Sequence, residues 1–465
     1  MFSWKFGVRG RVCYNWGMKK YNTSPISGMQ ELLPGLQAEF NRLKSGIAEA
    51  IHAHGFQNIE TPTIDRTEIL LAKAGGDTEK QIYKVVKTAE TADDADQALR
   101  FDHTVPLARY TVEHMNDLAF PFKVSQIGRN FRGERAQKGR FREFYQCDAD
   151  IIGWGTLPIA YDAEAIAALI DAMQVLPLPS ITVRVSNRKL LNGLLEELNL
   201  NGQSKEIFDI IDHAEKVPRE ATISALTELG IGSEDIDKVM KFIAINGSRD
   251  EVIPRLREFG FGNAGFNEGV AELDEVLTIL ERKLERLSGS GVSGEPSTEA
   301  SRVLPTSVVA DMMIVRGLDY YTGTVFETIV PEHREIGSIC GGGRYENLAS
   351  NYTEQKLPGV GGSIGLTRLF YILQNYGLVE ASSIKPVDVC LVPFSAAEFA
   401  TAEELAEKLR KDGRRVDIAM TDKRLGDKMK YAAKVADSAI VIGEDEVRSG
   451  KFMVKDLTTG EITEL

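Results

Sequence analysis

The sequence predicts an α+β protein, in which an antiparallel sheet is flanked by helices, interrupted by a mostly helical insertion and followed by a small C-terminal α/β domain. Strand-like segments around residues 99–104, 122–131 and 141–152 gather with few crossover helices, which favours an antiparallel sheet. Residues 186–287 are instead rich in Leu, Glu, Lys and Ile at helical spacing. From residue 386 onward strands and helices alternate, which is typical of a largely parallel sheet.

The size and composition limit the class of protein. A chain of 465 residues exceeds what one hydrophobic core supports, so two or three domains are expected. Hydrophobic residues make up 43% and charged residues 26%, as in soluble globular proteins, and no window approaches the roughly eighteen consecutive apolar residues that a membrane span needs. The net charge of −13 argues against a coat of positive charge but leaves room for a local basic groove.

The cysteines and the N-terminus bear on the compartment. The four cysteines are far apart and form no C-x-x-C pair, so neither a zinc site nor a disulfide framework is indicated, and a cytoplasmic location is expected. Residues 1–30 hold five basic residues and no acidic one, which fits either an organelle transit peptide or a start codon placed too early, with Met18 as the true start. The segment lacks the Ser-rich character of transit peptides, which favours a non-native extension over residues 1–18.

The main domain is expected in two parts, at residues 19–185 and 303–380. A helix from 34 to 54 is predicted by apolar residues in steps of three and four, at Leu36, Phe40, Leu43, Ile47 and Ile51. The extended segment 56–64 contains Pro62 and is therefore expected at a sheet edge. Further helices are expected at 160–173 and 366–376.

The insertion and its linker are expected to cover residues 186–302. At the end of this stretch Gly289, Gly291 and Gly294 spell G-x-G-x-x-G. A dinucleotide site needs a strand before these glycines and a helix after them, whereas here a charged helix precedes and a Ser/Glu/Pro stretch follows. A flexible connector is therefore expected.

The chemistry is concentrated in a basic segment. Six basic residues fall within fourteen positions: Arg129, Arg132, Arg135, Lys138, Arg140 and Arg142. They are either a solvated loop or part of a site, and the alternation of side chains along a strand, with a period of two residues, favours a site. In a strand from Arg140 to Ile151, one face would carry Arg140, Arg142, Phe144, Gln146, Asp148 and Asp150. Guanidinium groups match phosphate oxygens, so this face could hold a polyphosphate beside a small polar molecule.

Several segments together resemble class II aminoacyl-tRNA synthetases. Phe131-Arg132-Gly133-Glu134 is similar to the F-R-x-E core of their second motif, residues 359–369 resemble the glycine-rich third motif, and residues 55–62 resemble the first, which lies at the dimer interface. Residues 316–323 and 340–345 resemble paired signatures of the histidyl-tRNA synthetase family. The resemblance covers the chain from about residue 26 and implies an antiparallel catalytic sheet, a homodimer, and residues 386–465 as an anticodon-binding domain.

The resemblance implies that the family's reaction joins L-histidine to tRNA(His) through a histidyl-adenylate, with ATP as substrate and Mg²⁺ accompanying it. Residues that bind ATP would be Arg132 at the α-phosphate, Glu134 at the adenine, and Arg140 and Arg368 at the terminal phosphates. Arg316 would stabilise the charge that develops as the substrate carboxylate attacks, so Arg132 and Arg316 are the expected catalytic residues. The metal ligands stay open, because no histidine shows a metal-binding spacing.

The histidine pocket implied by the resemblance combines these arginines with carboxylates, hydroxyls and an amide: Asp102, Thr104, Arg132, Gln146, Asp150, Arg316, Tyr320 and Tyr321. A carboxylate and a phenol, Asp150 and Tyr321, would bind the two imidazole nitrogens in a way that an apolar isostere cannot satisfy. Asp102 and Thr104 are expected on one strand face, with His103 packing on the other.

One departure from the family pattern and two alternative functions follow from the residues. Thr367 stands before Arg368 where many relatives carry an acid, which leaves the ATP contacts open there. The main functional alternative is a non-catalytic, histidine-sensing regulatory relative, which typically lacks the C-terminal domain and has eroded arginines. The other is a synthetase for threonine, proline or glycine, which the Arg316–Tyr321 segment disfavours.

The basic residues of the C-terminal domain are expected along one helix, at Lys423, Arg424, Lys428, Lys430 and Lys434.

Overall fold

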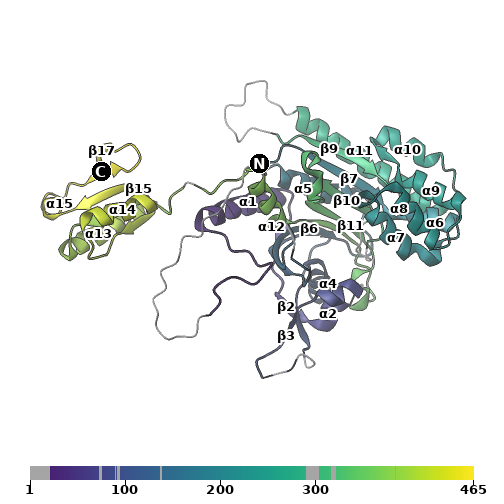
Figure 1. Ribbon diagram of the computed structural model, residues 1–465, viewed down its shortest axis with the longest axis horizontal. Helices are drawn as coiled ribbons and strands as arrows, with labels where there is room; N and C mark the ends of the chain where they lie inside the picture. Colours follow the sequence, from purple (N-terminus) through teal and green to yellow (C-terminus); the bar gives the residue numbers. More distant parts are fainter. Residues whose placement is uncertain are drawn as a thin grey trace. The chain divides into compact units, whose positions relative to one another are not determined.

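The structure, a computed structural model, describes residues 21–72, 76–89, 91, 95–136, 139–289, 303–315, 321–382 and 384–465 (Figure 1). The chain divides into two compact units, one formed by residues up to 31 and from 46 to 375, the other by residues 32–45 and 376–465. Among the described helices, none combines the length and the apolar character needed to cross a membrane.

A mixed sheet forms the centre of the larger unit. Over the described residues it has nine strands in the order β1-β5-β6-β12-β11-β10-β7-β9-β8. Their bounds are β1 (Gln57–Asn58), β5 (Phe122–Phe131), β6 (Glu143–Ile152), β7 (Ile181–Asn187), β8 (Asn246–Gly247), β9 (Thr306–Asp311), β10 (Thr324–Ile329), β11 (Cys340–Tyr345) and β12 (Gly359–Ile364). Only β1–β5 and β7–β9 pair in parallel, so the predicted α+β class with a mainly antiparallel sheet is confirmed.

Helices pack against this sheet. Helix α5 (Ala160–Met173) packs on β6 and β12, and α12 (Leu366–Asn375) packs on β6. In α5 the small side chains of Ala163, Ala165 and Ala168 are fully buried, which lets the helix lie close to the sheet. Helix α1 (Pro34–Ala53) begins and ends within one residue of its prediction, and its predicted residues from Phe40 to Ile51 are buried.

The segment from 56 to 113 differs from the prediction in one respect. A small second sheet is formed by β2 (Ile64–Arg66), β4 (Gln97–Leu99) and β3 (Lys84–Val85), beside α2 (Thr67–Leu71) and α3 (Gly76–Gln81). The strand expected over 99–104 is wrong, because it ends at Leu99 and α4 (Thr104–Glu113) starts at Thr104. The Asp102 carboxylate accepts a hydrogen bond from the Val105 N–H at 3.1 Å, which satisfies a donor of the first helical turn.

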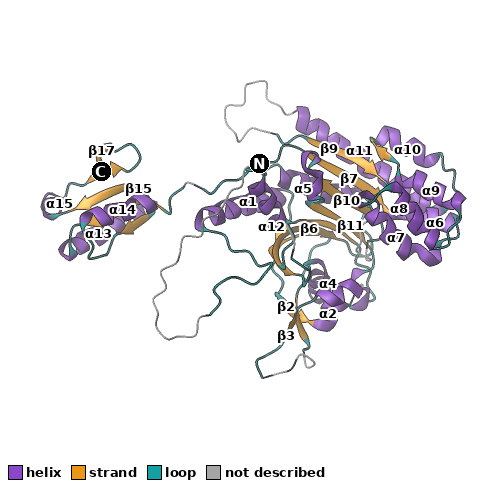
Figure 2. Cartoon of the chain, viewed as in Figure 1, coloured by secondary structure: helices purple, strands orange, loops and turns teal. Residues whose placement is uncertain are grey.

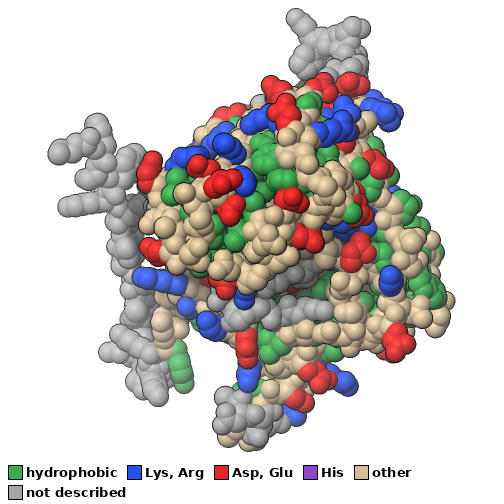
Figure 3. Space-filling model, turned by 90° about the vertical axis from the view of Figure 1, so that its right-hand side faces the viewer, with side chains coloured by type: hydrophobic (Ala, Val, Ile, Leu, Met, Phe, Trp, Pro, Cys, Tyr) green, Lys and Arg blue, Asp and Glu red, His purple; other side chains and the backbone are tan. Residues whose placement is uncertain are grey.

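The insertion is helical, and its helices gather beyond β7 and β9 (Figure 2). They are α6 (Arg188–Glu197), α7 (Ser204–His213), α8 (Arg219–Glu228), α9 (Ser233–Ile243), α10 (Arg249–Arg257) and α11 (Ala264–Gly289). Helix α11 returns to the sheet, where it contacts α5, β7 and β9. The expected connector lies outside the described residues after Gly289. On the face seen in Figure 3, acidic and basic side chains are interspersed, as expected of a solvated helical surface.

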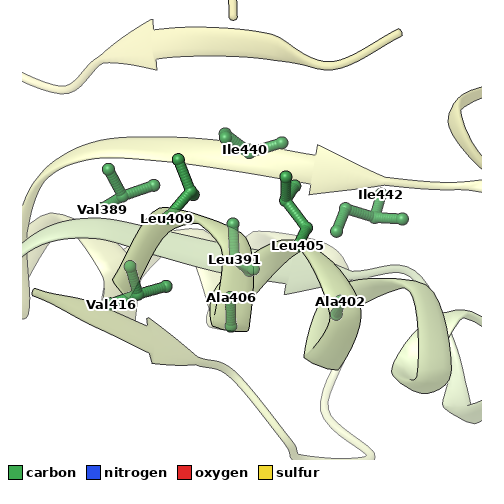
Figure 4. Close-up of a cluster of buried hydrophobic side chains, with 9 residues drawn as sticks. All are labelled: Val389, Leu391, Ala402, Leu405, Ala406, Leu409, Val416, Ile440 and Ile442. Carbon is green, nitrogen blue, oxygen red and sulfur yellow. The ribbon is translucent and has the colours of Figure 1, made fainter. Parts of the chain in front are cut away.

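The smaller unit contains a five-stranded sheet over its described residues, in the order β14-β13-β15-β16-β17. Its elements are β13 (Val387–Pro393), α13 (Phe399–Lys411), β14 (Val416–Ile418), α14 (Leu425–Val435), β15 (Ala436–Ile442), α15 (Glu444–Ser449), β16 (Met453–Asp456) and β17 (Ile462–Glu464). The first three strands are parallel and the last two antiparallel. Aliphatic side chains such as Leu391, Leu405 and Ile440 form its core between α13 and the sheet (Figure 4).

The predicted basic helix of this unit needs two corrections. Helix α14 begins at Leu425, so Lys423 and Arg424 precede it. Lys428 is buried instead of facing solvent, and its ammonium donates hydrogen bonds to the carbonyls of Pro393, at 2.8 Å, and Phe394. Lys428 therefore fixes the end of β13 from inside the unit.

Candidate active site

A cavity of about 580 Å³ opens over β6, β11 and β12 in the larger unit. The alternation predicted for β6 is observed from Phe144 onward, because Phe144, Gln146, Asp148 and Asp150 line this cavity while Cys147, Ala149 and Ile151 are fully buried. The strand itself begins at Glu143, three residues later than predicted. Arg140 and Arg142 therefore reach their positions from the preceding loop, where Gly139 has a φ of +72°.

Arg132 is held between two aromatic rings. Its guanidinium carbon lies 4.3 Å from the centre of the Phe101 ring and 5.1 Å from that of Phe144. Arginine stacks on aromatic faces with its N–H donors in the plane of the guanidinium group, so they stay available at the edge of the stack. The site thus presents a fixed cation to any anion in the cavity.

Two more arginines line the same cavity and act electrostatically on each other. Arg368, on α12, lines the cavity together with Arg140, and its guanidinium donates to the Ile336 carbonyl. Burial lowers the pKa of Arg368, and the positive charge of Arg140 lowers it further. Arg140 pairs with Glu134 at 3.3 Å, with its side chain about half exposed. Two like charges held together in this way favour a polyanionic ligand between them.

Carboxylates line the same cavity. Burial raises the pKa of Asp102 and raises that of Asp150 well above its usual range, and the charge of Asp148 adds to both shifts. The Tyr345 hydroxyl donates a hydrogen bond to Asp150 Oδ1 at 3.0 Å. A side chain at Gly361 would overlap this carboxylate, so only glycine fits opposite Asp150 on β12. Crowded carboxylates of this kind favour a cationic ligand.

The structure brings nine of the predicted site residues to this one cavity: Asp102, Thr104, Arg132, Glu134, Arg140, Gln146, Asp150, Tyr321 and Arg368. Arg316 and Tyr320 lie outside the described residues. Asp102 and Thr104 do share the cavity, but from the start of a helix and not from a strand face. Thr367 is buried, and its hydroxyl accepts a hydrogen bond from the Tyr145 N–H at 2.7 Å, so it holds the start of β6.

Sequence reasoning missed several lining residues. Tyr345, in a segment already noted for its resemblance, was given no role, although its hydroxyl donates a hydrogen bond to Asp150. Asp148 was predicted on the correct strand face without a role, and Ser363, which donates a hydrogen bond to it, was noted only as part of the segment 359–369. Asp212, from α7 of the insertion, also borders the cavity. The alternation of side chains along β6 is the sequence signal that could have pointed to Asp148. The contacts made by Tyr345, Ser363 and Asp212 depend on how distant segments pack, which one sequence does not show.

His103 does more than pack. It is 1% exposed, and its Nδ1 lies 3.2 Å from Asp148 Oδ2, an ion-pair distance, although neither ring nitrogen forms a hydrogen bond among the described residues. Over the described part of the chain no group of three His, Cys, Asp or Glu side chains is arranged to hold a metal ion by itself.

A mainly antiparallel sheet beneath a cavity lined by three arginines and three aspartates of the surrounding segments is typical of a ligase domain of the class II synthetase type. The comparisons with known proteins specify the family. The family model for histidyl-tRNA synthetase matches residues 28–369, and the model for an anticodon-binding domain matches residues 388–465. The chain therefore belongs to the histidyl-tRNA synthetase family.

Individual relatives agree with this assignment over nearly the full length. The chain is 42% identical to a histidine–tRNA ligase of Clostridium tetani, covering 95% of this chain and 96% of that protein. It is 40% identical to that of Xanthomonas campestris, covering 95% and 93%. The solved histidyl-tRNA synthetase from Nostoc has a TM-score of 0.79 at 35% identity, covering 96% of this chain and 97% of that one.

A structure described as an ATP phosphoribosyltransferase regulatory subunit/histidyl-tRNA synthetase, from Bacillus halodurans, has a TM-score of 0.71. It is 22% identical and covers 91% of this chain, so it shows the shared fold alone.

Proposed function

We propose that this protein is a histidine–tRNA ligase, which activates L-histidine with ATP and transfers it to tRNA(His). The observation that carries this function is that one cavity gathers three arginines, Arg132, Arg140 and Arg368, together with the carboxylates of Asp102 and Asp150. A triphosphate fits the arginines, and an amino acid with an ammonium and an imidazole fits the carboxylates. Both reactants are then held in one cleft, as ligation requires.

In the first step the histidine carboxylate attacks the α-phosphate, and pyrophosphate leaves. No protein nucleophile is needed, so catalysis consists of positioning and charge stabilisation. Arg132 would bind the α-phosphate, since its stacked guanidinium is fixed in place. Arg140 and Arg368 would bind the terminal phosphates, Glu134 the adenine, and Arg316 the developing negative charge.

The carboxylates of the cavity would hold the amino acid. Asp150 would bind the imidazole with help from Tyr321, Tyr320 and the Tyr345 hydroxyl, while Asp102, Thr104 and Gln146 would bind the α-ammonium group. In the second step the terminal ribose hydroxyl of the tRNA attacks the adenylate carbonyl and AMP leaves. We assign no general base to this step.

The domains would divide the work. Residues 19–185 and 303–380 would form the catalytic domain, 186–302 the insertion and linker, and 386–465 the anticodon-binding domain. In the last of these, Phe394 is 61% exposed, and Lys423 and Arg424 are exposed in the same unit; exposed rings and cations suit single-stranded RNA. Mg²⁺ would enter bound to the phosphates of ATP, the protein would act as a homodimer, and its place would be the cytoplasm, where tRNA is charged.

Pyrophosphate exchange tests this function. The protein is incubated with ATP, labelled pyrophosphate and one of histidine, threonine, proline or glycine. Exchange with histidine alone is expected. Exchange with another of the four would reassign the substrate, and no exchange with any of them would favour the histidine-sensing regulatory relative.

A variant examines the role of Arg316. Arg316→Ala is expected to abolish exchange while histidine binding stays measurable, because the residue would act on the charge that develops during attack. Arg219→Ala, an exposed arginine on α8 of the insertion, is the matched control and should exchange at the wild-type rate. An Arg316→Ala enzyme with an unchanged rate would remove Arg316 from this role.

A further inference from the structure

Arg100 is a buried arginine that joins two parts of the larger unit. The residue is 2% exposed, and its side chain donates hydrogen bonds from Nε to the Arg129 carbonyl at 2.8 Å and from Nη1 to the Thr61 carbonyl at 2.7 Å. Its backbone N–H donates to the Thr63 carbonyl at 2.9 Å, and its carbonyl accepts from the Phe131 N–H at 3.0 Å. Arg100 therefore fastens the segment before β2 to the C-terminal end of β5.

The charge of Arg100 is costly at this position. Burial lowers the pKa of Arg100, and the charges of Glu60 and Asp148 offset this effect only in part. The hydrogen bonds of its side chain go to backbone carbonyls, and among the described residues it forms no ion pair. A buried charge without a counter-charge destabilises a fold. Packing alone therefore does not account for an arginine here, and such a cost is typical of functional sites.

The contacts of Arg100 lead directly to Arg132. The pairing of β5 with β6 ends at Phe131, so Arg132 lies just beyond the strand. Phe101, which follows Arg100, lies with the centre of its ring 4.3 Å from the Arg132 guanidinium carbon, and its carbonyl accepts from Arg132 Nε at 3.4 Å. Two consecutive residues thus hold the end of β5 and the residue after it. A displacement of Arg100 would move the Phe101 ring and with it the guanidinium group of Arg132.

We propose that Arg100 is a positioning residue for adenylate formation, which holds the Phe101 ring and thereby the Arg132 guanidinium where the α-phosphate is to bind. This inference rests on the proposed function and adds a residue that does not itself line the cavity. Position matters for the rate, because a displacement of about 1 Å can cost about a hundred-fold. Asp102 follows Phe101, but the hydrogen bond from the Val105 N–H anchors its carboxylate separately, so the effect is confined to the phosphate contact.

A glycine beside the guanidinium group offers an independent way to displace it. A Cβ atom at Gly128 of β5 would lie 2.5 Å from Arg100 Nη2 and 3.2 Å from His103 Nε2. Gly128 has no positive φ, so its backbone suits alanine, and the added methyl group acts on the neighbouring side chains alone. Gly128→Ala therefore displaces the guanidinium group without removing its charge. Arg100→Lys also keeps the charge, but it loses the fork with which Nε and Nη1 reach two carbonyls.

The test measures ATP–pyrophosphate exchange by the full-length protein, with the thermal unfolding of each variant measured alongside. Arg100→Lys and Gly128→Ala are each expected to lower kcat by a factor of about ten to a hundred, while the KM for histidine stays within about two-fold of the wild type. The unfolding curves give the folded fraction, so that kcat is expressed per folded molecule. A wild-type kcat in any variant that folds overturns the inference, and Gly128→Ala keeps the test decisive if Arg100→Lys does not fold.

Double variants distinguish this route from a general disturbance of the fold. Phe101→Leu removes the ring through which Arg100 would act. Adding Arg100→Lys or Gly128→Ala to Phe101→Leu should therefore lower kcat by less than about three-fold further. Equal effects with and without the ring would overturn the inference, because Arg100 would then act by another route.

Arg184→Lys is the matched control. Arg184 is an arginine of the central sheet, 6% exposed, that pairs with Asp311 at 2.8 Å and does not line the cavity. This variant should keep the wild-type kcat, and a reduction equal to that of Arg100→Lys would overturn the inference by showing that any buried arginine of the larger unit has this effect. A wild-type protein that exchanges with none of the four amino acids would overturn the proposed function, whereas normal wild-type exchange with unaffected variants overturns the inference alone.

Discussion

Asp162→Ala should destabilise the catalytic sheet, because it leaves Arg344 buried without its main counter-charge. Asp162 is fully buried, Arg344 is 5% exposed, and Arg344 Nη2 lies 2.7 Å from Asp162 Oδ1. Removing one partner of such a pair costs about 3–5 kcal/mol. Arg344 keeps a second, half-exposed partner in Glu346 at 3.0 Å, so the lower end of this range, about 3 kcal/mol, is expected.

Hydrogen–deuterium exchange can measure this loss locally. Amides in β11, which contains Arg344, and in α5, which contains Asp162, would exchange about 150 times faster when exchange follows the free energy of opening. Glu68→Ala is the matched control, since Glu68 lies 3.8 Å from Arg66 with both side chains about three-quarters exposed, and it should leave exchange unchanged. An acceleration of less than ten-fold in Asp162→Ala would refute the reasoning from the buried charge.

Three further predictions follow from other contacts. Tyr345→Phe removes the hydrogen bond to Asp150 and should raise the KM for histidine by roughly ten-fold or more while the KM for ATP stays constant, a contrast that pyrophosphate exchange measures. The hydrogen bond of His54 to Asp171, at 2.8 Å, raises the pKa of His54 to about 9, so its contribution to stability is full below pH 6.5 and is lost as the pH rises toward 9. When the free energy of unfolding is measured across this pH range, His54→Gln should remove this pH dependence. An unchanged dependence of the unfolding free energy on pH would exclude His54 as its source. Lys428→Met leaves the Pro393 carbonyl without its buried donor and should weaken tRNA binding in a filter assay but not tRNA-independent exchange; equal loss of both would contradict a role confined to the smaller unit.

The sequence predicted the site best where local geometry decides it. The period of two placed Gln146 and Asp150 on one face of β6 correctly, because alternation along a strand needs no knowledge of its neighbours. Asp102 and Thr104 were placed on a strand, because the capping of α4 by Asp102 was not considered. The α+β class could be predicted for the same reason as β6, since each segment shows its own period.

Contacts that depend on strand register were not predictable from one sequence. Ser363 meets Asp148 only because β12 pairs with β6 in one particular register, across more than two hundred residues of chain. The Tyr345 hydroxyl reaches Asp150 from β11, the strand beyond β12, where glycine at position 361 leaves the space. Neither a propensity nor a motif encodes such distances, so Tyr345 and Ser363 were missed as site residues.

The contacts of the Arg132 guanidinium with the Phe101 and Phe144 rings restrict its rotamers before any ligand arrives. A flexible arginine loses about 0.5–1.5 kcal/mol of conformational freedom when a partner immobilises it. Here that loss is incurred during folding of the chain, so an incoming phosphate meets a preorganised partner. Replacing either phenyl ring would therefore weaken nucleotide capture even though the ring itself carries no charge.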